Sequence, residues 1–183
     1  INWKPDDVIV NNDALTEYLT YEAWQQADEG WFYNQNSING IVYVNLGLNL
    51  LGLPWNLYPY ISLFGRALLE MGTGTEDFVS LSRRIASRTG GIWSHIFTSP
   101  LAGSDDTAAW LFLRGKAVSG RVADLLGILK DVLLDARFND RERFRQIVLE
   151  EKARQEQRLI PSGHRMVAVR IKSHFAKSYL IDE

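Results

Sequence analysis

Three histidines, His95, His164 and His174, are the side chains on which a metal site or a general base could be built in this chain. A metal-binding helix of the form H-x-x-E-H places two imidazoles and a carboxylate on one face. The residues after His164 read Arg-Met-Val-Ala and those after His174 read Phe-Ala-Lys-Ser, so neither histidine completes this pattern. We interpret both as surface or interface histidines, and His95, in a predicted strand, as a packed or hydrogen-bonded structural residue.

Other chemistries are excluded by composition or spacing. The chain has no cysteine, which excludes a disulfide framework, a zinc finger and a thiol nucleophile. Gly115-Lys116 is followed by Ala, and Trp110 stands where a phosphate loop needs its first glycine. A chain of 183 residues without cysteine is compatible with bacterial cytoplasm, periplasm or an organelle matrix, so the compartment stays open.

Charge is distributed unevenly along the sequence. Residues 1–36 carry one Lys against seven acids (−6), residues 37–136 carry eight of each, and residues 137–183 carry 11 basic against seven acidic residues (+4). The total of −2 gives no global reason to bind nucleic acid or an anionic membrane. A nucleic-acid binder that uses the basic tail is the weakest of the functions considered, and it would require affinity that falls steeply with salt.

A charged segment follows the strongest apolar helix pattern. Glu150 and Glu151 lie on a predicted helix with Arg141, Arg143 and Arg145. The usual role of such a set is a solvated helix face with i, i+4 pairs such as Glu150 with Arg154, and this is the interpretation that the spacing favours.

The elements that must position these residues form an α+β domain. Hydrophobic alternation and helical spacing predict a largely antiparallel sheet with helices packed on one face. The predicted order is two strands, a helix that ends near Met71, a second helix begun by a Thr73–Glu76 capping box, a hairpin, and three helices of which the middle one starts at Asn139. In detail, we expect strands at 31–33, 41–50, 92–99 and 108–115, a turn over 34–40, and helices at about 54–71, 76–89, 120–136, 139–160 and from 163 onward.

The domain organisation is expected to be simple. Residues 1–30 are an acidic lead-in segment or linker with scattered aromatic residues, suited to lying over another surface, and residues 31–183 form one domain. The chain looks excised from a longer protein, because its last residues are still apolar and helix-compatible without a Gly or Pro stop. No apolar run reaches the ~18 residues that a membrane span requires.

Aromatic residues alternate along both strands of the predicted hairpin. Trp93, His95 and Phe97 share one strand face, and Trp110, Phe112 and Arg114 share the other strand's face. On an uncovered sheet face they would line a groove for a peptide or a base, whereas under the helices they would be ordinary core. The core interpretation is the one that hydrophobicity favours.

Several motifs in order resemble the presequence-protease branch of the insulinase/pitrilysin zinc-peptidase family. They are NGIVYVNLGLNLLGLPWNLYPYISLFGRALLEMGTG, SRRIASRTGGI, LRGKA and SGHRMVAVR, and they cover most of residues 31–183. The resemblance implies the first domain of the C-terminal half of such a protease, whose two halves close around a chamber and whose zinc is held by the N-terminal half.

The resemblance also implies where a metal site would have been. The family's H-x-x-E-H helix ends in a G-T turn, which here is Gly72-Thr73, so its ligand and base positions fall on Leu63, Arg66 and Ala67. The distal glutamate ligand falls near Glu150 or Glu151. Such a domain has no catalytic residues and no metal of its own, and an isolated carboxylate cannot hold zinc in a peptidase geometry.

The function implied is that of a chamber-wall domain in an enzyme that hydrolyses short unstructured peptides, with the remaining domains of its own chain as partners and with no nucleic acid or membrane. The strand face with Tyr43, Asn45 and Asn49 is expected to point toward the chamber. The alternative is a scaffold or assembly protein that kept the fold and lost the chemistry in both halves.

Overall fold

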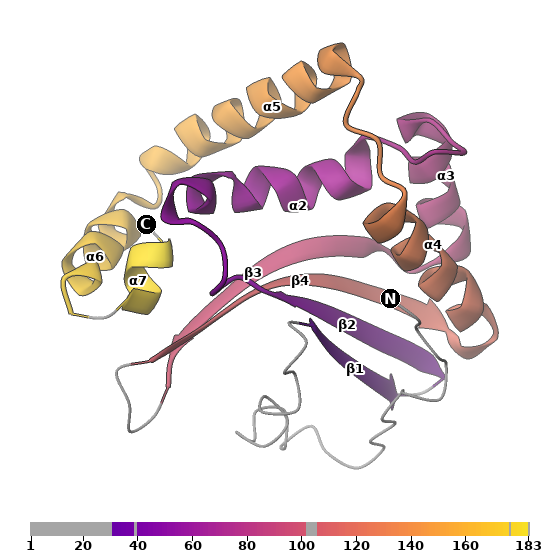
Figure 1. Ribbon diagram of the computed structural model, residues 1–183, viewed down its shortest axis with the longest axis horizontal. Helices are drawn as coiled ribbons and strands as arrows, with labels where there is room; N and C mark the ends of the chain where they lie inside the picture. The colour runs from indigo at the N-terminus through magenta and orange to yellow at the C-terminus, as the bar shows by residue number, and fades with distance from the viewer. Residues whose placement is uncertain (1–30, 39, 102–105, 176, 183) are drawn as a thin grey trace.

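A computed structural model describes residues 31–38, 40–101, 106–175 and 177–182 (Figure 1). The predicted lead-in of residues 1–30 lies outside these ranges. The described part is a four-stranded sheet with helices packed on one face, which confirms the α+β prediction. Within the described ranges, no helix combines the length and apolar character that crossing a bilayer requires.

The sheet is antiparallel throughout, and its spatial order is β1-β2-β4-β3. Each strand alternates between a face under the helices and a face away from them, because successive side chains point to opposite sides. The long central strand β4 has neighbours on both sides, so its register positions the other strands. The strands are β1 (Trp31–Ile38), β2 (Ile41–Asn49), β3 (Ile92–Pro100) and β4 (Thr107–Val118).

The helices form one layer over the sheet, with α5 as the outermost element in Figure 1. Short 3-10 turns, Trp55–Tyr60 and Ser119–Arg121, lead into α2 and α4. The helices are α2 (Ile61–Glu70), α3 (Phe78–Arg88), α4 (Val122–Leu134), α5 (Arg141–Leu159), α6 (Gly163–Ser173) and α7 (Lys177–Asp182).

The main core lies between α4 and the centre of the sheet. Val44 of β2 and Leu113 of β4 are fully buried against Leu125, Ile128 and Val132 of α4. These residues are the inward set of the predicted strand alternation and helix stripe. The sequence pattern therefore predicted the main core correctly.

Two helix starts differ from the prediction. Asp77, rather than Thr73, caps α3, because its Oδ1 accepts the Ser80 N–H at 2.8 Å. Thr73 instead forms a β-bridge with Ala136, and the predicted capping glutamate, Glu76, pairs with Arg84 at 2.6 Å. The capping box was wrong because the turn at residues 72–77 is pinned to the end of α4 before the helix can begin.

The second difference is one residue in size. The N-cap of α5 is Asp140, whose side chain accepts the Arg143 N–H at 2.9 Å, rather than Asn139. Both residue types cap helices, so composition alone does not separate them.

The first strand is longer than its hydrophobic part. The predicted turn over residues 34–40 is wrong, because β1 continues to Ile38 and pairs with β2 residue by residue up to Ile38 opposite Ile41. The tight connection between the two strands includes Gly40, whose φ is +76°. Strand pairing overrides local preference here, as β-propensity depends strongly on context.

The aromatic residues of the hairpin are on the face away from the helices. Ser94 of β3 and Leu111 of β4 lie against α2 at Gly65, so their neighbours Trp93 and Phe112 point to the opposite side. The interpretation of these aromatics as helix-covered core was wrong. Hydrophobicity alone cannot tell which sheet face the helices cover.

The close contact of α2 with the sheet depends on Gly65. A Cβ at this position would lie 2.9 Å from the Cβ of Ser94 and 3.1 Å from Leu111 Cδ1. We expect Gly65→Ala to lower the free energy of unfolding by about 1–3 kcal/mol, because overpacking outweighs the better helix propensity of alanine. Urea unfolding followed by circular dichroism measures this change.

A second helical glycine supplies the control for this prediction. A Cβ at Gly127 of α4 would meet only Arg84 Nη2, at 3.8 Å. Gly127→Ala is therefore expected to stabilise the chain by up to about 1 kcal/mol. Equal effects at the two positions would show that the contact at Gly65 is not tight.

Candidate functional site

The predicted positions on α2 lie beside α5. Leu63 and Ala67 pack with Ile147 of α5 and with Met71, and both Ala67 and Ile147 are buried. Leu63 and Ala67 are one turn apart and therefore share the α5-facing side of α2. Arg66 reaches the same helix through its charged end.

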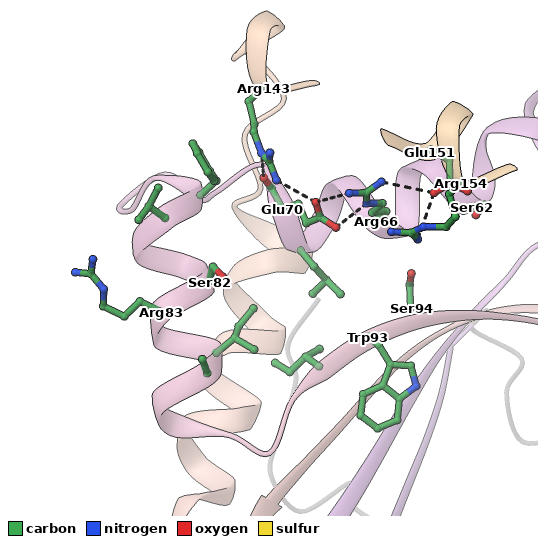
Figure 2. Close-up of a pocket in the computed structure, with 16 residues that line it drawn as sticks. Ser62, Arg66, Glu70, Ser82, Arg83, Trp93, Ser94, Arg143, Glu151 and Arg154 are labelled. Atoms are coloured by element: carbon green, nitrogen blue, oxygen red, sulfur yellow. Dashed lines mark hydrogen bonds and ion pairs between the residues drawn. The ribbon is translucent and has the colours of Figure 1, made fainter. Parts of the chain in front are cut away.

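Arg66 is the centre of an ion-pair cluster in which two helices meet (Figure 2). Its Nε donates to Glu70 Oε1 at 2.7 Å, and one Nη donates to the carbonyl of Ile147 at 3.3 Å. The guanidinium also donates to Glu150 and lies 3.6 Å from Glu151. The structure therefore brings Leu63, Arg66 and Ala67 together with the two predicted distal carboxylates.

A second arginine extends this cluster toward α3. Arg143 donates to the Glu70 carbonyl at 3.1 Å and to Glu70 Oε2 at 3.0 Å. Its guanidinium lies 4.4 Å from the centre of the Phe78 ring, a cation–π contact. The Arg66 and Arg143 side chains are largely buried, so both charges need the carboxylates that surround them.

The ionisation of the cluster follows from these contacts. Hydrogen bonding to Glu70, and then to Glu150, raises the pKa of Arg66 above its ordinary value despite burial of the guanidinium. The Arg66 guanidinium in turn lowers the pKa of Glu150. The cluster is thus charged on both sides throughout the neutral range.

Sequence reasoning missed this cluster. The solvated-face interpretation is wrong for Arg143, which is bound to Glu70, and the expected pair of Glu150 with Arg154 is replaced by a contact of 3.4 Å from Arg154 to Glu151. The i, i+4 spacing of Arg66 and Glu70 was a visible signal. The partners on α5 were not visible, because they are about 80 residues away in the chain.

A cavity of about 840 Å³ lies next to the cluster, between α2, α3, α5 and the start of β3. Arg66 and Glu70 form one wall, and Trp93 and Ser94 of β3 form another (Figure 2). Arg83 also lines the cavity, but its side chain points away from the ion pairs in this view. None of the described residues that line the cavity is a histidine.

The donor set of this region does not fit a zinc ion. The structure describes no group of three or more His, Asp or Glu side chains that could hold a metal in residues 31–182 outside the gaps named above. At the motif positions, leucine and alanine have no donor atom, and the Arg66 guanidinium is a cation that occupies the carboxylates. His164 and His174 are exposed on and after α6, and His95 is exposed on the opposite sheet face.

The residues expected to face a chamber lie on the other side of the sheet. Tyr43, Asn45 and Asn49 follow one another along β2 on the face away from the helices. Tyr43 and Asn49 are exposed, and Asn49 Oδ1 accepts the Leu51 N–H at 2.9 Å. The structure therefore does not bring this row together with the Arg66 cluster.

Comparison with known proteins defines the class of the chain as a peptidase-type domain that is similar to a part of much longer proteases. The model of the family described as associated with peptidases of family M16, subfamily C, matches residues 11–183. Presequence protease 1, chloroplastic/mitochondrial, of Arabidopsis thaliana is 38% identical over 133 residues, which are 73% of this chain and 12% of the relative. The chain belongs to this peptidase-associated family, in the presequence-protease branch of the M16 peptidases, as the resemblance implied, and it corresponds to their C-terminal region.

Two other relatives show the range of the similarity. Protein HypA of Clostridium perfringens is 30% identical over 146 residues, covering 79% of this chain and 15% of the relative. Presequence protease, mitochondrial, of Danio rerio is 26% identical over 135 residues, covering 72% of this chain and 13% of the relative. The chain thus spans only 12% to 15% of the length of these curated relatives.

Proposed function

We propose that this chain is a non-catalytic wall domain of a zinc metallopeptidase that degrades short unstructured peptides, such as cleaved presequences. The observation that carries the proposal is the ion pairing of Arg66 with Glu70, Glu150 and Glu151. A guanidinium stands where the family's zinc helix has its carboxylate, and it binds the carboxylates expected at the distal ligand position. The zinc-bound water that attacks a peptide bond would then belong to another part of the full protein.

The substrate class is taken from the printed names of the relatives, which are presequence proteases. A wall domain contributes to catalysis by shaping a chamber that admits flexible peptides and excludes folded proteins. We assign the row of Tyr43, Asn45 and Asn49 on β2 to the chamber side, because its phenol and amide groups can hydrogen-bond to peptide backbones of any sequence.

The proposal predicts that the 183-residue chain alone holds no stoichiometric zinc and does not cleave peptides. Metal analysis after dialysis against zinc, together with mass spectrometry of an unfolded peptide of ~25 residues incubated with the chain, measures both properties. One tightly held zinc per chain would overturn the proposal.

The full-length protein separates the peptidase from a scaffold. It is expected to cleave the same peptide in a zinc-dependent reaction and to leave a folded protein that contains that peptide sequence intact. A properly folded full-length protein that cleaves neither substrate would contradict the peptidase proposal and favour the scaffold alternative.

A further inference from the structure

The helix-free face of the sheet carries an aromatic surface at its β3–β4 side. We use this name for six residues whose side chains share that face and oppose one another in pairs. The pairs are Trp93 with Arg114, His95 with Phe112, and Phe97 with Trp110. The Trp110 and Phe112 rings stack with centroids 6.3 Å apart, and Phe97 meets Phe112 edge-on at 6.2 Å.

Two of these rings are buried although the helix layer is on the other side of the sheet (Figure 1). Trp110 and Phe112 are each 5% exposed, whereas Trp93 at the sheet edge is 42% exposed. Contacts within a single layer of side chains leave the outer faces of rings open to solvent, so burial to this degree indicates a covering layer.

Arg114 gives the charge that such a cover must carry. Its Nε is buried and has no hydrogen-bond partner among the residues that the structure describes, and its guanidinium lies 5.3 Å from the centre of the Phe112 ring. The residues opposite it, Trp93 and Asn45, offer no carboxylate. Burial lowers the pKa of Arg114. A buried guanidinium is costly unless an acid binds it, which favours an acidic cover.

The lead-in segment of this chain has the matching composition. Residues 1–30 contain seven acids and one lysine, together with Trp3, Tyr18, Tyr21 and Trp24. The segment joins the sheet at the required end, because Trp31 pairs with Leu48 and the next residue, Asn49, pairs with Trp110. Thirty residues extend up to about 100 Å and β4 is only about 40 Å long, so the segment is long enough to cross the surface.

We propose that residues 1–30 dock across the aromatic surface and supply a carboxylate to Arg114. The acidic residues pair with the guanidinium, and the aromatic residues of the lead-in cover Trp110 and Phe112. The docked segment occupies the β3–β4 side of the face and leaves the β2 row of Tyr43, Asn45 and Asn49 to the chamber. The lead-in is then a structural layer of the domain and not a free linker.

Proteolysis by the glutamate-specific protease Glu-C tests this proposal, because the lead-in offers it Glu17, Glu22 and Glu29. In the 183-residue chain, these bonds are expected to be cut much more slowly than in a synthetic peptide of residues 1–30. Arg114→Glu is expected to speed this cleavage at least about tenfold, because cleavage follows the population of the undocked segment. Arg114→Lys, which keeps the charge, is expected to retain most of the protection.

A matched control separates docking from net charge. Arg158→Glu makes the same charge change at an exposed position of α5 and is expected to leave cleavage of the lead-in unchanged. Equal rates for Arg114→Glu and Arg158→Glu, or unprotected cleavage in the unaltered chain, would overturn the proposal. Circular dichroism verifies that each variant is folded.

Zero-length carbodiimide cross-linking gives a test without any substitution. Lys116 follows Arg114 on the same strand face, whereas Lys152 is exposed on α5 at the other side of the molecule. Acidic residues of the lead-in are expected to couple to Lys116 and not to Lys152. Coupling to both lysines at the same yield, or to neither, would contradict the docking.

Discussion

Replacing Arg66 by alanine is expected to lower the free energy of unfolding of the chain by about 3 kcal/mol, since removing one partner of a largely buried ion pair leaves charges without compensation. The Arg66 side chain is only 12% exposed, and it binds carboxylates of two helices. Without it, Glu70 keeps Arg143 as a partner, but Glu150 and Glu151 lose their link to α2. Thermal unfolding is expected to shift down by about 6–12 °C.

A neighbouring arginine provides the control for this prediction. Arg154 is 49% exposed and has one contact, 3.4 Å from Glu151, so Arg154→Ala is expected to cost less than about 1 kcal/mol. Arg66→Met, which retains most of the packing of the side chain, separates the loss of charge from the loss of apolar contacts. Equal costs for Arg66→Ala and Arg154→Ala would show that the cluster is an ordinary surface pair.

Restoring the metal-binding motif is the second large effect. The triple variant Leu63→His, Arg66→Glu, Ala67→His is expected to bind one zinc ion per chain, where the unaltered chain binds none. Positions 63 and 67 face Ile147, and Glu151 lies one turn further along the same side of α5 with its carboxylate 15% exposed. Two imidazoles and one carboxylate are the ligand set of many catalytic zinc sites. Metal analysis and calorimetric titration measure the binding.

This experiment has an internal control. Adding Glu151→Gln to the triple variant is expected to weaken zinc binding at least about tenfold, because a neutral amide is a poorer zinc ligand than a carboxylate. An imidazole at the buried Ala67 position overpacks the α2–α5 contact, so the triple variant is also refolded in the presence of zinc. A folded triple variant without zinc affinity would contradict the correspondence of α2 with the zinc helix.

Local periodicity predicted the elements but not the way in which they meet. The alternation in β2 and the stripe of α4 were sufficient for the core, because each pattern is set by which residues enter one apolar layer. The turn between α2 and α3 was misassigned, since its conformation depends on Ala136, which is far away in the chain. Long-range pairing of this kind leaves no trace in the local sequence.

The candidate site was only half visible for the same reason. The motif positions on α2 could be counted from the Gly72-Thr73 turn, and the carboxylates of α5 could be assigned to the same region through the family resemblance. The reach of Arg66 across the two helices, and its competition with Arg154 for Glu151, are properties of the folded geometry. The covered face of the sheet was likewise undecidable, because Trp110 and Leu111 are both apolar.

The Arg66 cluster also bears on how the domain responds to its surroundings. A site held together by zinc loosens when a chelator removes the ion or when acid protonates its imidazoles. A covalently attached guanidinium cannot be extracted and keeps its proton at every physiological pH. The junction of α2 and α5 is therefore insensitive to metal starvation, a condition in which zinc-dependent domains lose their cohesion.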